Sequence, residues 1–90
     1  MPLEQQKFFD GLGFEEYEFE YHFGTKKCYK GEDGGFYRVD YFGNTYVIEF
    51  AENEDDAKLN RFEDSDLVDD SLNKEDLVQY IRDTLKEYVN

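Results

Sequence analysis

This 90-residue chain has one cysteine, one histidine, one proline and no tryptophan. Cys28 has no second cysteine with which to form an intramolecular disulfide, so the sequence is not that of a disulfide-stapled secreted scaffold. One histidine and one cysteine do not supply the ligand set of a zinc or copper site. No stretch has the length and apolar character of a membrane span or a signal-peptide core. We therefore expect a cytoplasmic protein of one domain, residues 1–90, with no cofactor.

Basic residues are also scarce. Ten Lys and Arg oppose 23 Asp and Glu, which gives a formal net charge of −13 at pH 7. This charge repels nucleic-acid phosphates and anionic membranes, so neither is expected as a direct partner. A folded core is still expected, because 39% of the residues are hydrophobic and nine Phe and eight Tyr provide large apolar side chains.

The negative charge is concentrated in residues 52–70, which we call the acidic segment. It holds nine carboxylates against Lys58 and Arg61, a net charge of −7. The sequence leaves open whether this segment is a helix or an ordered loop. Residues 54–62 are compatible with a short helix, residues 64–66 are typical of a turn, and Leu67 and Val68 are expected to return to the core.

The pattern of residues 14–51 predicts two β-hairpins, because aromatic residues alternate with polar ones. In the second hairpin, a two-residue turn at Gly43 and Asn44 makes three apolar pairs and one charge pair agree on one register. These pairs are Tyr41–Tyr46, Val39–Ile48, Tyr37–Phe50 and Arg38–Glu49. In the first hairpin, a turn at 24–26 is predicted, which pairs Tyr21 with Tyr29. The same face is then expected to bury six tyrosines: Tyr17, Tyr21, Tyr29, Tyr37, Tyr41 and Tyr46.

Helices are predicted at both ends of the chain. A short one is expected from Leu3 to Asp10. A longer one begins after Asn73, a good N-cap with Asp76 at the third helical position. Its apolar stripe is expected to cover one face of the sheet; it consists of Leu77, Ile81, Leu85 and Tyr88. The prediction is an α+β fold, with a four-stranded antiparallel meander packed on the C-terminal helix and a short N-terminal helix.

Few residues offer catalytic or metal chemistry. His22 alternates with glutamates on a polar strand face and is interpreted as solvated, because a catalytic histidine needs an orienting partner and a nucleophile. Three nearby lysines would favour a reactive Cys28 thiolate, but a small residue in a strand is the simpler interpretation. Alternating aspartates at residues 64–70 are compatible with calcium ligation, yet Val68 and Asp69 stand where an EF-hand loop needs an oxygen ligand and a glycine. We predict neither an enzyme nor a metal site.

The predicted function is a small acidic protein-binding domain. Such a domain would neutralise a basic partner, as an inhibitor or immunity-type protein does, because complementary charge speeds and orients association. A nucleic-acid mimic of phage or bacterial origin is one alternative, and a metal-responsive or accessory domain using residues 52–70 is another; the oligomeric state stays open. The predicted partner-binding residues are six aspartates and two exposed aromatics: Asp55, Asp56, Asp64, Asp66, Asp69, Asp70, Phe36 and Phe42.

Overall fold

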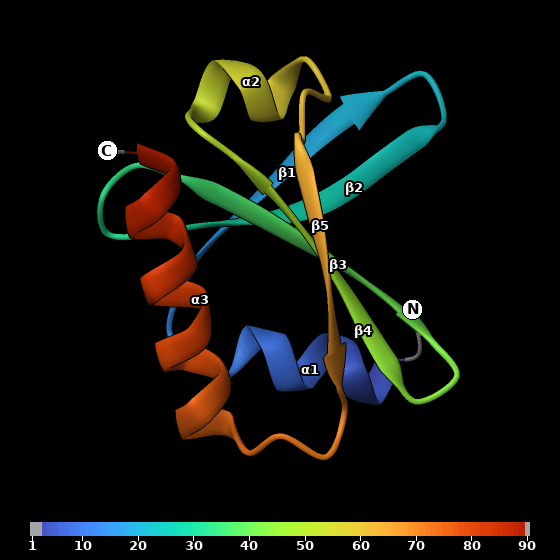
Figure 1. Cartoon of the computed structure of the whole chain (residues 1–90). Coiled ribbons are helices and arrows are strands. Elements are labelled where there is room, and N and C mark those ends of the chain that lie inside the picture. The colour runs from blue at the N-terminus through green and yellow to red at the C-terminus, as the bar shows by residue number, and fades with distance from the viewer. Residues whose placement is uncertain (1–2, 90) are drawn as a thin grey trace.

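A computed structural model describes the chain from residue 3 to residue 89, with side chains described at residues 7–63 and 65–88. It confirms an α+β fold, in which one antiparallel sheet packs with helices (Figure 1). The five strands lie in the order β1-β2-β3-β4-β5, so the predicted meander gains one strand. In chain order the elements are α1 (Leu3–Asp10), β1 (Glu15–Tyr21), β2 (Gly24–Lys30), β3 (Phe36–Phe42), β4 (Thr45–Ala51), α2 (Glu54–Lys58), β5 (Asp64–Asp69) and α3 (Lys74–Val89).

One face of the sheet, called here the first face, packs against α1 and α3 (Figure 1). The predicted stripe of α3 supplies Leu77, Ile81 and Leu85 to this core. Asn73 caps α3 as predicted, since its side-chain oxygen accepts a hydrogen bond from the Asp76 amide at 2.9 Å. The sheet contributes an aromatic-rich set: Tyr29, Tyr37, Val39, Tyr46, Ile48, Phe50 and Val68. Of the helices within residues 3–89, none is long and apolar enough to span a bilayer.

The β3–β4 hairpin has the predicted register. Tyr41 pairs with Tyr46, and all three other predicted pairs are present. Local sequence determines this hairpin because the turn residues and the cross-strand pairs favour the same alignment.

The predicted register of the β1–β2 hairpin is wrong. The turn lies at His22 and Phe23, and β1 pairs Tyr17 with Cys28 and Tyr21 with Gly24. Gly24 follows the turn with φ +121°, a conformation that favours glycine. An odd shift of register moves side chains to the opposite face. Tyr17 and Tyr21 therefore lie on the face of Cys28, whereas the prediction placed them with the first-face tyrosines.

The other face of the sheet, called here the second face, has a small core of its own. Cys28, Phe36, Ala51 and Ala57 are buried there, and Tyr17, Phe19 and Phe62 pack against them. Phe36 was predicted to be exposed for partner binding, and this is wrong: it is fully buried because α2, Phe62 and the β1 aromatics cover this end of the face. The ring centroids of Phe36 and Tyr17 are 5.2 Å apart.

The acidic segment contains both a short helix and a strand. Residues 54–58 form α2, within the range compatible with a helix, but residues 64–66 belong to β5 and not to a turn. β5 pairs Val68 with Tyr46 and Leu67 with Val47. Successive residues of a strand point to opposite faces. Val68 is therefore buried as expected, whereas Leu67, also expected in the core, is 75% exposed.

Candidate protein-binding surface

The acidic segment is held to the fold at both ends by backbone hydrogen bonds. The Glu63 amide donates to the Phe50 carbonyl at 3.0 Å, and the Asp70 amide donates to the Asn44 carbonyl at 3.1 Å. The α2 helix is capped by Asn53, whose side-chain oxygen accepts from the Asp56 amide at 2.9 Å. The backbone that carries the carboxylates of this segment is thus held in place by the fold.

Little of the segment's charge is neutralised by neighbouring cations. Among its described side chains, residues 52–63 and 65–70, Glu54 alone forms an ion pair, with Lys58 Nζ at 3.1 Å. Asp55 is exposed and Asp56 is half-buried, both on α2. The negative field of this surface is therefore directed into solvent.

The carboxylates at the β5 end accept hydrogen bonds from neighbouring groups. Asp66 accepts from the Tyr80 hydroxyl, and Asp70 accepts from the Tyr41 hydroxyl at 2.6 Å. Asp69 accepts from the Ser71 amide at 2.8 Å, which lowers the pKa of its carboxyl. The Asp64 side chain lies outside the described ones.

The predicted acidic residues do not form one continuous row. The β5 register places Asp66 on the first face with Ile48, while Asp69 lies on the second face with Thr45. Phe42 is 67% exposed near the β3–β4 turn, as predicted. No three metal-ligating side chains come together within the part of the chain that the structure describes.

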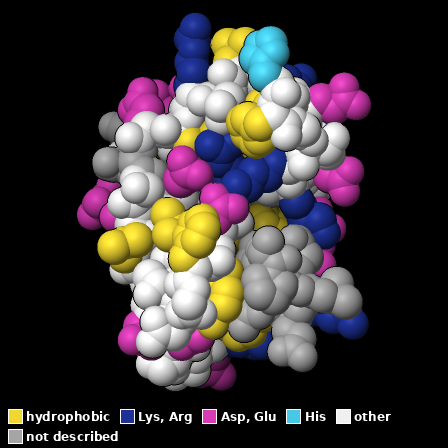
Figure 2. Space-filling view, turned by 90° about the vertical axis from the view of Figure 1, so that its right-hand side faces the viewer, with side chains coloured by type: hydrophobic (Ala, Val, Ile, Leu, Met, Phe, Trp, Pro, Cys, Tyr) yellow, Lys and Arg dark blue, Asp and Glu magenta, His cyan; other side chains and the backbone are white. Residues whose placement is uncertain are grey.

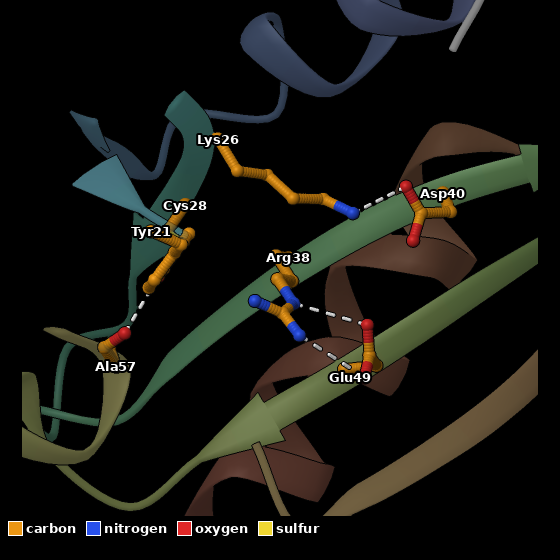
Figure 3. Close-up of polar contacts among 7 residues, drawn as sticks. All are labelled: Tyr21, Lys26, Cys28, Arg38, Asp40, Glu49 and Ala57. Atoms are coloured by element: carbon orange, nitrogen blue, oxygen red, sulfur yellow. Dashed lines mark hydrogen bonds and ion pairs between the residues drawn. The ribbon is translucent and has the colours of Figure 1, made fainter. Parts of the chain in front are cut away.

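The second face also contains two ion pairs, one between the two hairpins and one within the β3–β4 hairpin (Figure 3). β2 and β3 pair at Tyr29–Tyr37 and Lys30–Phe36, and beyond these residues the two hairpins diverge (Figure 1). Lys26 Nζ bridges this divergence to Asp40 at 2.6 Å. Arg38 is only 7% exposed and donates from Nε to Glu49 at 3.1 Å. The sequence predicted the Arg38–Glu49 pairing but not its burial.

Arg38 also lies over two aromatic rings of this face. Its guanidinium carbon is 4.0 Å from the Phe62 ring centroid and 5.6 Å from that of Tyr21. Guanidinium groups stack favourably on aromatic rings. The acidic segment, through Phe62, thus closes one end of the second face over a buried charge.

Cys28 and Tyr21 are structural residues of this face. Burial raises the pKa of the Cys28 thiol above its usual value, which disfavours the thiolate. The Tyr21 hydroxyl donates to the Ala57 carbonyl at 2.7 Å and so ties β1 to α2 (Figure 3). Burial likewise raises the pKa of this hydroxyl.

An open hollow of about 460 Å³ lies between the β1–β2 turn and the C-terminal end of α2. Two of its lining side chains are exposed hydrophobics, Phe23 at 61% and Leu59 at 60%. Figure 2 shows this end of the molecule, with His22 in cyan beside hydrophobic side chains. The complete lining is Glu20, Tyr21, His22, Phe23, Lys58, Leu59 and Asn60.

Sequence reasoning missed this hollow because it placed Phe23 in a strand and not in a turn. One usable signal was Asn60, which has φ +60° and follows Leu59, the C-cap of α2. Asparagine is one of the residues that tolerate this left-handed conformation at helix ends. It marks where α2 stops and where Leu59 becomes exposed.

Comparison of this chain with protein-family models, with curated proteins and with solved structures found no match.

Proposed function

We propose that this chain is a small acidic, non-catalytic protein-binding domain that binds and neutralises a basic protein surface. The observation that carries the proposal is the acidic segment, whose backbone is fixed at both ends and whose described carboxylates, apart from Glu54, have no cationic partner. Fixed charges lose less conformational freedom on binding than charges on a disordered tail. They also steer a basic partner during diffusional encounter.

The described groups that could take part in chemistry support a binding role. Cys28 is fully buried, and the Tyr21 hydroxyl is engaged with the Ala57 carbonyl. His22 lies exposed in a turn, where a side chain contacts solvent. The proposal is accordingly one of recognition by charge and shape.

The test begins with affinity capture of a partner from the source organism. The purified partner is then titrated into this protein by calorimetry at about 0.05 M salt and at about 0.5 M salt; at the higher concentration, exposed charges are strongly screened. We expect a basic partner whose affinity falls steeply at the higher salt concentration. A variant with Asp55→Asn, Asp56→Asn and Asp69→Asn should bind much more weakly.

The matched control carries the same change of three charges at exposed positions outside the acidic segment: Glu18→Gln, Glu75→Gln and Glu87→Gln. This control variant should bind the basic partner more tightly than the triple aspartate variant does. Equal losses in the two variants would mean that only the net charge matters, and failure to recover any salt-sensitive basic partner would contradict the proposed function.

A further inference from the structure

We infer that the hollow between the β1–β2 turn and α2 receives an apolar side chain from a basic segment of the protein partner. This inference rests on the proposed function and adds a location and a partner chemistry to it. Its starting point is the distribution of exposed apolar residues. Among the described residues, the large exposed hydrophobics are Phe23, Phe42, Leu59 and Leu67, and two of them line this one hollow.

The walls of the hollow are fixed before any partner binds. The rings of Tyr21 and Phe23 stack with centroids 5.1 Å apart, which supports the turn side. The hydrogen bond from the Tyr21 hydroxyl to Ala57 joins that side to α2. On the α2 side, the Leu59 amide donates to the Asp55 carbonyl at 3.0 Å. A preformed apolar surface requires little ordering on binding.

The size of the hollow suits one anchoring side chain with its flanking backbone. Its volume of about 460 Å³ lies in the range of about 300–1,000 Å³ typical of ligand pockets. Binding energy at protein interfaces is concentrated in such anchors, with a polar rim around them. Phe23 and Leu59 would provide the apolar contact, and the remaining lining residues are mostly polar.

The charges around the hollow select a basic partner segment. Its lining cation, Lys58, is already paired with Glu54. Glu20 lines the hollow on the turn side, and Asp55 and Asp56 lie on the α2 helix that ends at it. Residues 20–23 and 54–61, which form and flank the hollow, carry four carboxylates against the two cations Lys58 and Arg61, so lysine or arginine residues flanking the apolar anchor would be attracted. The occupant that fits is an aromatic or aliphatic residue within a Lys- or Arg-rich stretch.

The probe is a blocked peptide Lys-Lys-Phe-Lys-Lys, titrated into the ¹⁵N-labelled chain at low salt and followed by amide chemical shifts. We expect the largest shifts at residues 20–23 and 58–60. Replacing the central Phe of the peptide by Ser should weaken binding by about tenfold, because partial burial of an aromatic side chain contributes about 1.4 kcal/mol or more.

Variants of the protein provide the matched comparison. Phe23→Ser and Leu59→Ser should each reduce affinity for the Phe peptide several-fold, while Phe42→Ser and Leu67→Ser should leave it unchanged. All four positions are similarly exposed, so the fold should tolerate each change. The amide spectrum of each variant checks this directly.

The outcomes distinguish a failure of the anchoring hollow from a failure of the proposed function. If the Phe and Ser peptides bind equally, with shifts spread over the acidic segment, the anchoring hollow is refuted while the proposed function stands. If neither peptide binds at low salt, both proposals are contradicted. Shifts that depend on the central Phe and are lost in Phe23→Ser or Leu59→Ser support both.

Discussion

The two faces of the sheet are built differently. The first face is covered by α1 and α3 over a continuous apolar core. The second face is closed at one end only, by α2 and Phe62, and it combines a small apolar cluster with the buried Arg38–Glu49 pair. Its open part carries Phe42 and Leu67, both strongly exposed.

The two faces therefore contribute differently to the stability of the fold. Apolar burial is the main source of folding free energy, and the first face provides most of it. The second face brings charged, aromatic and exposed apolar side chains together, and the hollow that we propose as a docking site lies where its edge meets α2. Recognition sites are commonly built in this way, on a rigid scaffold that is stabilised elsewhere.

The largest predicted effect tests whether the second face has a true core. Phe50 on the first face and Phe36 on the second are both fully buried on adjacent strands. Phe50→Ala and Phe36→Ala should each lower the free energy of unfolding by about 3–5 kcal/mol, since each leaves a cavity. Urea denaturation measures both. A cost below about 1 kcal/mol for Phe36→Ala would show that the second face merely lies under α2 without a packed core.

The second prediction concerns the buried charge. The Arg38–Glu49 pair lies on the same two strands as the Val39–Ile48 pair of the first face. Arg38→Met should destabilise the fold by about 2 kcal/mol, because Glu49 loses its partner in a partly buried site. The double variant Arg38→Met with Glu49→Leu should recover most of this loss, since apolar pairs often replace buried ion pairs without cost.

Thermal and urea unfolding of both single variants and the double variant complete this cycle. Recovery is favoured because Arg38 Nη1 is buried with no hydrogen-bond partner among the described residues. If the double variant is instead destabilised by the sum of the two single changes, the coupling energy is zero, and Arg38 and Glu49 stabilise the fold independently and not as a pair.

The sequence was sufficient for the parts of the fold in which several local constraints agree. The β3–β4 register followed from three apolar pairs and one charge pair, and α3 from its cap and its stripe. The β1–β2 register did not follow, because aromatics occupy both phases of the pattern: Tyr17 and Phe19 pack on the second face, while Tyr29 packs on the first. Alternation shows which residues share a face but not which face is buried.

The candidate site was less predictable than the fold. β5 has an aspartate-rich sequence with low strand propensity, and it is a strand because it pairs with β4. The burial of Phe36 depends on α2 folding back over the second face. The hollow depends on the exact position of one turn and on contacts between residues about 36 apart in sequence, such as Tyr21 with Ala57. Local patterns carry no information on such contacts.

The third prediction compares the helices that cover the two faces. Asn73 and Asn53 cap α3 and α2 with equivalent hydrogen bonds of 2.9 Å. Asn73→Ala should lower the free energy of global unfolding by about 1 kcal/mol, because α3 is part of the first-face core. Asn53→Ala should have a smaller global effect and should instead speed amide exchange at residues 56–59, since α2 has five residues and buries only Ala57. Equal global effects would mean that α2 unfolds only with the whole domain.

The smallest predicted effect on stability concerns Tyr41, at the margin of the first face. The Asp70 carboxylate accepts the hydrogen bond of the Tyr41 hydroxyl and raises the pKa of Tyr41 from its usual 10.0 to about 12. An unfolded tyrosine loses its proton near pH 10. The contribution of the Tyr41–Asp70 hydrogen bond to folding stability is therefore fully present below pH 10 and should be lost as the pH rises from 10 toward 12. Tyrosine-ring NMR of the folded protein, with Tyr41→Phe to assign the signal, gives the midpoint directly. Asp70→Asn should move it back toward 10, because the amide accepts the hydrogen bond without the negative charge. A midpoint near 10 in the unmodified chain would show that Asp70 and Tyr41 are not joined in solution, and that β5 is held at this end by its backbone alone.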